Sequence, residues 1–247
     1  MLHRSLISCF LLCLLSANVN GQQVLRYENV LGTSFELQID ASDRTIAELE
    51  TIVFAEIDRL SATLSHYSDS SEISELLANS EVGKSARISN SLAEVLSEAE
   101  RLRVLTGGAF DVRSGELAHM WQRAASESRP PTRADCMAVT KSLASPPFQL
   151  TGSQLTKLDH LSWSLDGLAK GYVLDRIAKV LVETASGASG VINIGGDIRS
   201  FGNQVVKVDI QDPFRPAENV LAVQNIALRP NSAICTSGSY RRGTTVA

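Results

Sequence analysis

The sequence contains little of what several common classes of protein require. It has only four cysteines and four histidines, and none of them has the spacing of zinc ligands. Its 23 basic and 27 acidic residues give a net charge of −4, so no excess of positive charge is available to bind nucleic acid. After the first segment, no apolar run approaches the roughly 20 residues that cross a bilayer. These absences argue against a zinc protein, a nucleic-acid-binding protein and an integral membrane protein.

The first 21 residues have the pattern of a secretory signal peptide. Arg4 precedes an apolar run at 6–15, which is too short to span a membrane, and small and polar residues follow it. We therefore expect cleavage after Gly21 and export across the inner membrane to the periplasm. The alternative is a lipoprotein signal with the lipid on Cys9 or Cys13, although neither cysteine follows the small residue that such signals usually have.

Removal of the signal peptide leaves residues 22–247, which are enough for one large domain with a substantial core. Two cysteines remain, Cys136 and Cys235. In an oxidising compartment they could form one disulfide, but two buried thiols fit the sequence equally well. Their spacing of about a hundred residues does not decide between the two.

Hydrophobic periodicity alternates between the strand and helix patterns along the chain. The predicted strands are 24–39 as a hairpin or strand pair, short strands at 149–165 around a turn at 151–153, and single strands at 191–194, 205–210 and 223–228. The predicted helices are 45–64, one starting at 70–72, 91–106, 132–143 and 169–185. Because strands and helices do not alternate regularly, the pattern predicts an α+β fold rather than wound βαβ units.

Four segments place glycine beside a carboxylate, a cation or a hydroxyl at the ends of these elements. They are Thr-Gly-Gly-Ala-Phe-Asp at 106–111, Leu-Asp-Gly-Leu-Ala-Lys-Gly at 165–171, Asn-Ile-Gly-Gly-Asp-Ile-Arg at 193–199 and Cys-Thr-Ser-Gly at 235–238. In the second, Lys170 lies in the first turn of a helix, which suits a phosphate but is also typical of a solvated lysine. In the third and fourth, the glycines suit backbone contact with a ligand, or simply a tight turn and a helix cap.

Five segments in this order closely resemble the motifs of the ApbE family of FAD:protein FMN transferases. They are Leu-Ser-His-Tyr-Ser-Asp-Ser-Ser-Glu-Ile-Ser at 64–74, Gly-Ala-Phe-Asp-Val-Arg at 108–113, Leu-Asp-Gly-Leu-Ala-Lys-Gly-Tyr-Val-Leu-Asp at 165–175, Val-Ile-Asn-Ile-Gly-Gly-Asp-Ile-Arg at 191–199 and Ala-Ile-Cys-Thr-Ser-Gly-Ser-Tyr at 233–240. The resemblance extends from about Gly32 to Arg242, nearly the whole mature chain.

The resemblance implies an α+β domain with mixed or antiparallel sheets flanked by helices. It also implies FAD as the donor substrate, Mg²⁺ as the metal, and transfer of FMN to a threonine hydroxyl of a partner protein with release of AMP. The partner would carry an acceptor pattern of the type Asp-x-x-Ser/Thr-Gly-Ala-Thr/Ser. Contact with a membrane would then arise through lipidation or through a membrane-bound acceptor.

The resemblance also assigns roles to residues of this sequence. It implies that Tyr67 packs on the isoalloxazine and that Ala109, Phe110 and Asp111 line the flavin pocket. Asp166 and Lys170 are expected to contact FAD, and Ala169 to offer a main-chain carbonyl to Mg²⁺. The residues expected at the AMP half of FAD are Asn193, Gly195, Gly196, Asp197, Thr236, Ser237 and Gly238. Lys170 and Asp111 are the expected catalytic residues. Leu31 stands where the family commonly has methionine, so that contact is expected to differ.

Family members continue with a histidine-containing stretch that ends in Asp-Pro-x-Thr-Gly, and then with an Asp-Ala-x-x-Thr segment that supplies magnesium ligands. Neither segment is in this sequence. We therefore expect a catalytic domain that is incomplete at its C-terminus and does not transfer FMN at an appreciable rate. Two alternatives are a flavin-binding protein without transferase activity and a metal-dependent FAD pyrophosphatase on the same scaffold.

Overall fold

The computed structural model describes residues 22–211 and 222–236. The expected signal peptide and two predicted site residues, Ser237 and Gly238, lie outside the described residues. Within the described part, no helix has both the length and the apolar character of a membrane span.

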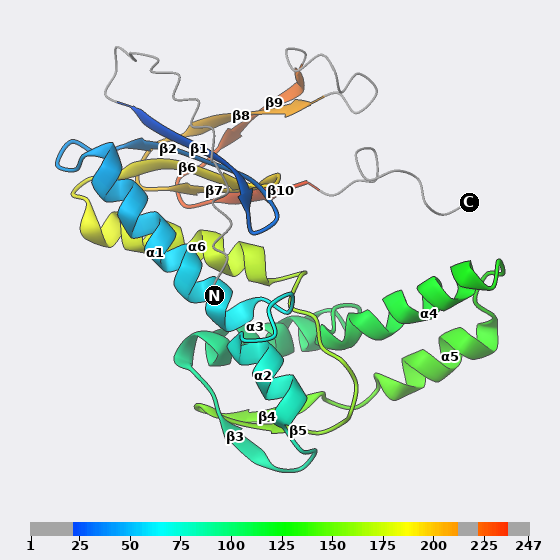
Figure 1. Ribbon diagram of the computed structural model, residues 1–247. Helices are drawn as coiled ribbons and strands as arrows, with labels where there is room; N and C mark the ends of the chain where they lie inside the picture. The colour runs from blue at the N-terminus through cyan, green and yellow to red at the C-terminus, as the bar shows by residue number, and fades with distance from the viewer. Residues whose placement is uncertain (1–21, 212–221, 237–247) are drawn as a thin grey trace, which may run out of the picture.

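The described chain forms two lobes, one above the other in Figure 1. The upper one, which we call the sheet lobe, is built on a five-stranded antiparallel sheet with the order β1-β2-β6-β7-β10. Its strands are β1 (Gln23–Val30), β2 (Thr33–Asp40), β6 (Ser189–Ile194), β7 (Asp197–Phe201) and β10 (Ala233–Cys235). Helices α1 (Ile46–Leu64) and α6 (Ala169–Thr184) lie side by side across one face of this sheet. Strands β8 (Val206–Gln211) and β9 (Ala222–Leu228) form a separate antiparallel pair.

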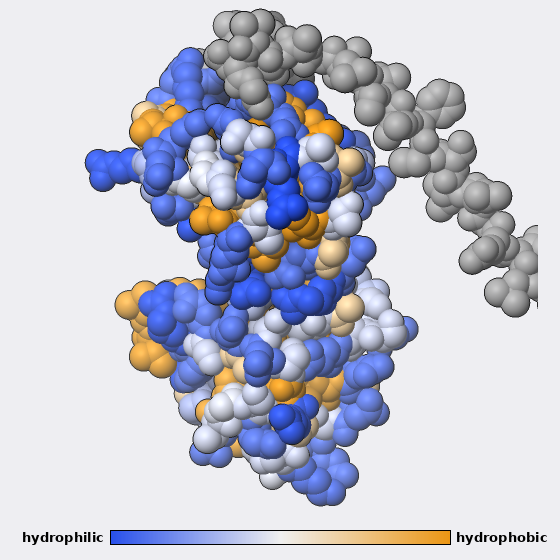
Figure 2. All heavy atoms as spheres, turned by 90° about the vertical axis from the view of Figure 1, so that its left-hand side faces the viewer, coloured by the Kyte–Doolittle hydropathy of each residue, from blue (hydrophilic) through white to orange (hydrophobic). Residues whose placement is uncertain are grey.

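The lower part, which we call the helical lobe, contains everything between α1 and α6. Its elements are α2 (Glu72–Asn79), β3 (Ser85–Arg87), α3 (Asn90–Leu105), the 3-10 turn η1 (Val112–Ser114), α4 (Gly115–Ser126), α5 (Arg133–Ser142), β4 (Phe148–Thr151) and β5 (Gln154–Lys157). The three strands make a small antiparallel sheet with the order β3-β5-β4. Figure 2 shows the narrow waist that separates the two lobes on one side of the molecule.

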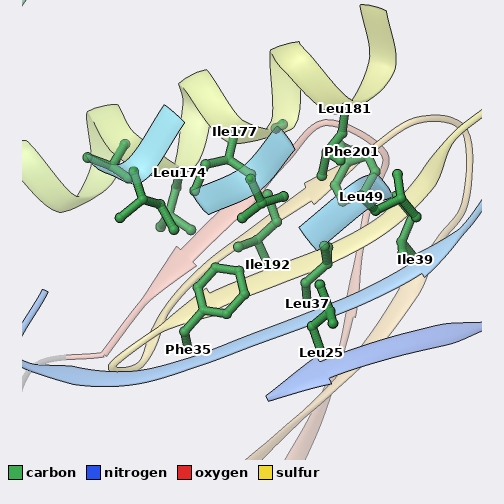
Figure 3. Packing of buried hydrophobic residues seen from close by; sticks show 14 of the residues in the cluster. Leu25, Phe35, Leu37, Ile39, Leu49, Leu174, Ile177, Leu181, Ile192 and Phe201 are labelled. Carbon is green, nitrogen blue, oxygen red and sulfur yellow. The ribbon is translucent and has the colours of Figure 1, made fainter. Parts of the chain in front are cut away.

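The core of the sheet lobe follows directly from the two hydrophobic periods in the sequence. Phe35, Leu37 and Ile39 alternate along β2 and are buried on the same face. Every third or fourth residue of α1 and α6 packs against them, and Figure 3 shows Leu174 and Ile177 above this face. Helix α1 begins where Thr45 and Glu48 form a capping box, as the sequence predicts for a helix over 45–64.

The helical lobe has its own core, which the ends of α1 and α6 enter. Leu92 and Leu96 of α3 pack there with Leu155 of β5 and with Leu64, the last residue of α1. Tyr172, in the first turn of α6, packs against both cores. The same two helices therefore belong to both lobes and join them.

The structure confirms the predicted α+β class, the opening hairpin and the five predicted helices, most of them to within one or two residues. The prediction of short strands over 149–165 is wrong beyond Lys157, because residues 158–168 form the connection to α6 instead. Five elements were not predicted: α4, β3, β7, β10 and the 3-10 turn η1. Helix α4 buries only Met120 and Ala124 and has no side-chain N-cap, so its sequence carries a weak signal.

Candidate functional site

Three connections of the sheet lobe meet at one edge of its sheet. Because β1, β6 and β10 run in the same direction, the turn after Val30, the turn after Ile194 and the residue after Cys235 all lie at that edge. The amide of Gly195 donates to the carbonyl of Ser34 at 3.0 Å. The hydroxyl of Thr236 donates to the carbonyl of Gly196 at 3.3 Å. The structure thus brings together three segments that are far apart in the sequence.

The two glycines of the β6–β7 turn are required by this close packing. Gly195 and Gly196 have φ angles of 62° and 95°, which side chains rarely adopt. A Cβ on Gly195 would lie 2.6 Å from Oγ1 of Thr33, and a Cβ on Gly196 would lie 2.8 Å from Oγ1 of Thr236. Asn193 completes the turn by accepting the amide of Gly196 at 2.9 Å. Internal hydrogen bonds therefore hold this turn in place, and Gly195 at its tip is exposed.

The N-terminus of α6 lies at the same edge of the sheet. Helix α6 runs antiparallel to β6, to which residues 185–188 connect it, so its first turn is near the end of β6 (Figure 1). Asp175 of α6 accepts Nε of Arg199 in β7 at 2.6 Å, which fixes the helix on the sheet. No side chain caps this helix start.

The first turn of α6 offers donors that the described residues leave unused. The amides of Ala169 and Tyr172 bind the carbonyls of Leu165 and Leu168, whereas those of Lys170 and Gly171 have no hydrogen-bond partner within residues 22–211 and 222–236. The half-buried Lys170 side chain forms no ion pair with any described residue. Two amides, a helix dipole and an ammonium group at one place favour an anion such as phosphate.

The helical lobe contributes an aromatic group beside this helix start. The rings of His66 and Tyr67 stack with their centroids 3.9 Å apart, and the Tyr67 hydroxyl donates to Oδ2 of Asp166 at 3.3 Å. The Tyr67 side chain is nevertheless 83% exposed. Gly167, next in the chain, is so close to Phe110 that a Cβ would lie 3.3 Å from its ring. Three predicted site segments, at 66–67, 110 and 166–167, therefore converge just before α6.

Asp111 has a different environment from the one expected of a pocket-lining carboxylate. It is 6% exposed, and its two oxygens accept Nε and Nη2 of Arg113 at 2.9 and 2.7 Å. It also accepts the backbone amide of Arg113 and so caps η1. Asp111 therefore holds the turn after Ala109 and Phe110, and its direct contact with a flavin stays a prediction.

The described residues contain no cluster of metal-binding side chains, and the assignment of Ala169 to Mg²⁺ stays a prediction. No group of three or more histidine, cysteine, aspartate or glutamate side chains that could hold a metal occurs within 22–211 and 222–236. Ala169 is the first residue of α6, and its carbonyl belongs to the hydrogen-bonding pattern of that helix. Magnesium prefers near-octahedral oxygen coordination that includes carboxylates, so one neutral carbonyl does not suffice.

The remaining predicted positions lie at the periphery of this edge. Leu31 adopts a φ of 51° in the β1–β2 turn and packs against the core of the sheet lobe. Asp197 pairs with Cys235 across β7 and β10. Partial desolvation of its sulfur and, to a smaller extent, the nearby Asp197 carboxylate raise the pKa of the Cys235 thiol above its ordinary value, so the thiol stays protonated at neutral pH. Cys136 and Cys235 are free and exposed, so neither the disulfide nor the buried thiols of the sequence analysis are found.

Two residues of the site region, His66 and Arg113, had no role assigned from sequence. His66 lies inside a recognised segment, but only its contacts with Tyr67 and Asp166 show what it does. Arg113 is fully buried, and sequence alone gives no reason to expect burial of a charged residue. That Cys235 lies opposite Asp197 follows from the pairing of β10 with β7, which no local sequence pattern indicates.

Comparison with known proteins identifies the family. The model of the ApbE family matches residues 31–246. The FAD:protein FMN transferase of Vibrio cholerae is 30% identical over 240 residues, covering 94% of this chain and 70% of that protein. The FAD:protein FMN transferase of Haemophilus influenzae is 29% identical over 211 residues, covering 81% of this chain. The chain spans 59% of the length of that relative and 33% of the length of the one from Rhodobacter capsulatus.

Solved structures show the same fold. The ApbE protein of Thermotoga maritima superposes with a TM-score of 0.73 at 21% identity, over 89% of this chain and 71% of that one. The flavin transferase ApbE of Vibrio cholerae gives a TM-score of 0.69 at 22% identity, over 91% of this chain and 74% of that one. Since the family model matches the chain from residue 31 to residue 246, this protein belongs to the ApbE family.

Proposed function

We propose that this protein is an FAD:protein FMN transferase, which moves FMN from FAD to a threonine hydroxyl of a partner protein and releases AMP. The observation that carries the proposal is the match of the ApbE family model over residues 31–246, together with relatives named FAD:protein FMN transferase. The partner would present a segment of the type Asp-x-x-Ser/Thr-Gly-Ala-Thr/Ser. Export to the periplasm is part of the proposal.

The arrangement of the site supports a ligand with a flat ring at one end and a nucleotide at the other. The exposed ring of Tyr67 suits the isoalloxazine, and the Phe110 ring lies close to Gly167, the residue after Asp166. The unused amides at the start of α6, together with Lys170, suit the pyrophosphate. The glycine turn at 195–196, with Thr236 beside it, suits the AMP half. Ser237 and Gly238 would extend this last contact.

The proposed reaction exchanges one phosphorus–oxygen bond for another. The threonine oxygen forms a bond to the phosphorus of the FMN half, the bond from that phosphorus to the oxygen of AMP breaks, and the hydroxyl proton is lost. Negative charge grows on the pyrophosphate oxygens as the bond breaks. Lys170 and the first amides of α6 would stabilise that charge, and the helix holds the amides in position before the reaction starts.

Magnesium, when bound, would neutralise part of the same charge. The Ala169 carbonyl is the one ligand that we assign to it, and we assign no step to the metal. Because the described residues offer flavin-binding groups but no cluster of metal-binding side chains, we keep a second candidate function, a flavin-binding protein that does not transfer FMN.

A transfer assay separates the two candidates. The full chain is incubated with FAD, Mg²⁺ and a peptide that carries the acceptor threonine, and the peptide is analysed by mass spectrometry. For the transferase, the peptide gains the mass of FMN less water, and a matched peptide with alanine for threonine gains nothing. FAD binding with an unmodified peptide supports the second candidate. Release of free FMN and AMP without peptide modification would indicate a pyrophosphatase.

FAD should bind more tightly than FMN. Only FAD can occupy both the aromatic group around Tyr67 and the glycine turn at 195–196, so the AMP half should add about tenfold or more in affinity, the equivalent of one or two hydrogen bonds. Isothermal titration calorimetry with both ligands measures the difference. Equal dissociation constants would mean that the glycine turn is purely structural.

A further inference from the structure

The chain passes between the two lobes twice, and both crossings lie at the candidate site. Residues 65–71 lead from α1 into the helical lobe, and residues 158–168 lead back from it to α6 (Figure 1). His66 and Tyr67 belong to the first crossing, and Asp166 belongs to the second.

These three side chains connect the crossings to each other. Nδ1 of His66 lies 3.3 Å from Oδ1 of Asp166, and the hydroxyl of Tyr67 donates to the other oxygen of the same carboxylate. The His66 ring also stacks on the Tyr67 ring at an interplanar angle of 37°. Asp166 is therefore contacted on both oxygens, and Tyr67 is held at its ring and at its hydroxyl.

The backbone of each crossing is fixed independently of these side chains. The buried Ser71 donates its hydroxyl to the carbonyl of Ser65 and so closes the first crossing into a loop. In the second crossing, Ser164 accepts the amide of Asp166 at 3.2 Å. The three side chains thus meet on a preformed frame, and a change at His66 need not disturb the fold.

We propose that His66 is a positioning residue of the flavin site, which acts by holding the Asp166 carboxylate and, through it, the Tyr67 ring. The identity of the flat ligand as a flavin rests on the proposed function. An exposed tyrosine without such support would sample several rotamers, and the ligand would have to order it on binding. His66 removes that cost before the ligand arrives.

The test compares two variants of His66: one keeps an aromatic ring without the nitrogen, and the other keeps a nitrogen without the ring. His66→Phe keeps an aromatic ring but loses the contact with Asp166, so FMN, the probe for the flavin half, should bind roughly five- to tenfold more weakly. His66→Asn places an amide nitrogen near the position of Nδ1 and should bind FMN within about twofold of the unmodified chain. Bound FMN should be more fluorescent in His66→Phe, because a mobile Tyr67 ring quenches it less. The melting temperature of the His66→Phe variant should equal that of the unmodified chain.

His119→Phe is the matched control, since His119 is an exposed histidine of α4, a helix that contributes no residue to either crossing. It should leave FMN binding unchanged. A double-mutant cycle with Asp166→Asn then tests the route of the effect: His66→Phe should add nothing once Asp166 is changed.

Unchanged FMN affinity in His66→Phe would overturn the inference. So would equal losses in His66→Phe and His66→Asn, or losses that multiply in the double variant, because His66 would then not act through Asp166. If the unmodified chain binds neither FMN nor FAD, the proposed function itself fails, and the inference fails with it.

Discussion

Replacing Arg113 by methionine should destabilise the protein by about 3–5 kcal/mol, the usual cost of removing one partner of a buried ion pair. The Arg113 side chain is completely buried, and it donates to Asp111, to Asp159 at 2.7 Å and to the carbonyls of Leu143 and Ser145. Methionine fills a similar volume but leaves the buried Asp111 carboxylate without its cation. Urea denaturation followed by circular dichroism measures the loss.

Arg129→Met provides a matched control in the same lobe. Arg129 also pairs with two carboxylates, Glu127 at 2.8 Å and Asp135 at 3.3 Å, but its side chain is 49% exposed. Exposed pairs contribute about 0–1 kcal/mol because water and salt screen them. Similar losses for the two variants would show that burial does not set the strength of the Arg113 cluster.

The Arg113 cluster also bears on the site, because it fixes two segments that reach it. Asp111 directly follows Phe110, and Asp159 lies at the start of the second crossing between the lobes. Burial lowers the pKa of Arg113, but the hydrogen bonds to Asp111 and Asp159 outweigh it and raise the pKa above its ordinary value. The guanidinium is therefore charged throughout the physiological range, and the cluster does not act as a pH switch through its arginine.

Local patterns in the sequence predicted most of the secondary structure. The period of two along β2 and the helical period of α1 and α6 are visible because one face of each element is buried against the same core. Caps such as Thr45 and Ser71 mark helix starts by a hydrogen bond within three residues, which local sequence reveals. The short strands β3 and β10 were missed because three residues carry no period, and only their partner strands define them.

The site was predictable as separate segments but not as an arrangement. Glycines at 195–196 and the lysine at the start of α6 were identified from local chemistry, whereas their meeting at one edge depends on the strand order. The contact of His66 with Asp166 joins residues a hundred positions apart, and no local rule pairs them. Asp111 was predicted to line the flavin pocket. In the structure it binds Arg113, only two residues away, because the turn at η1 directs both side chains inward.

Lys170→Ala should weaken FAD binding by roughly 10- to 100-fold, while riboflavin, which has no phosphate, should bind as it does to the unmodified chain. A hydrogen bond to a charged group contributes about 1.5–3 kcal/mol, and Lys170 is the ammonium nearest in sequence to the unused amides at the start of α6. The amides remain in the variant, so binding should be reduced rather than abolished. Calorimetric titration with both ligands measures the two affinities.

Lys179→Ala tests whether the effect depends on the end of the helix rather than on charge alone. Lys179 lies in the same helix, farther from its N-terminus, and contacts Glu183 at 3.8 Å. Its removal changes the net charge by the same amount but should alter FAD affinity by less than about twofold, because an exposed charge far from the ligand is screened. Equal losses for the two lysines would indicate a general electrostatic effect. A loss of riboflavin binding in Lys170→Ala would place this lysine at the flavin ring, and the assignment of the pyrophosphate to the start of α6 would then be wrong.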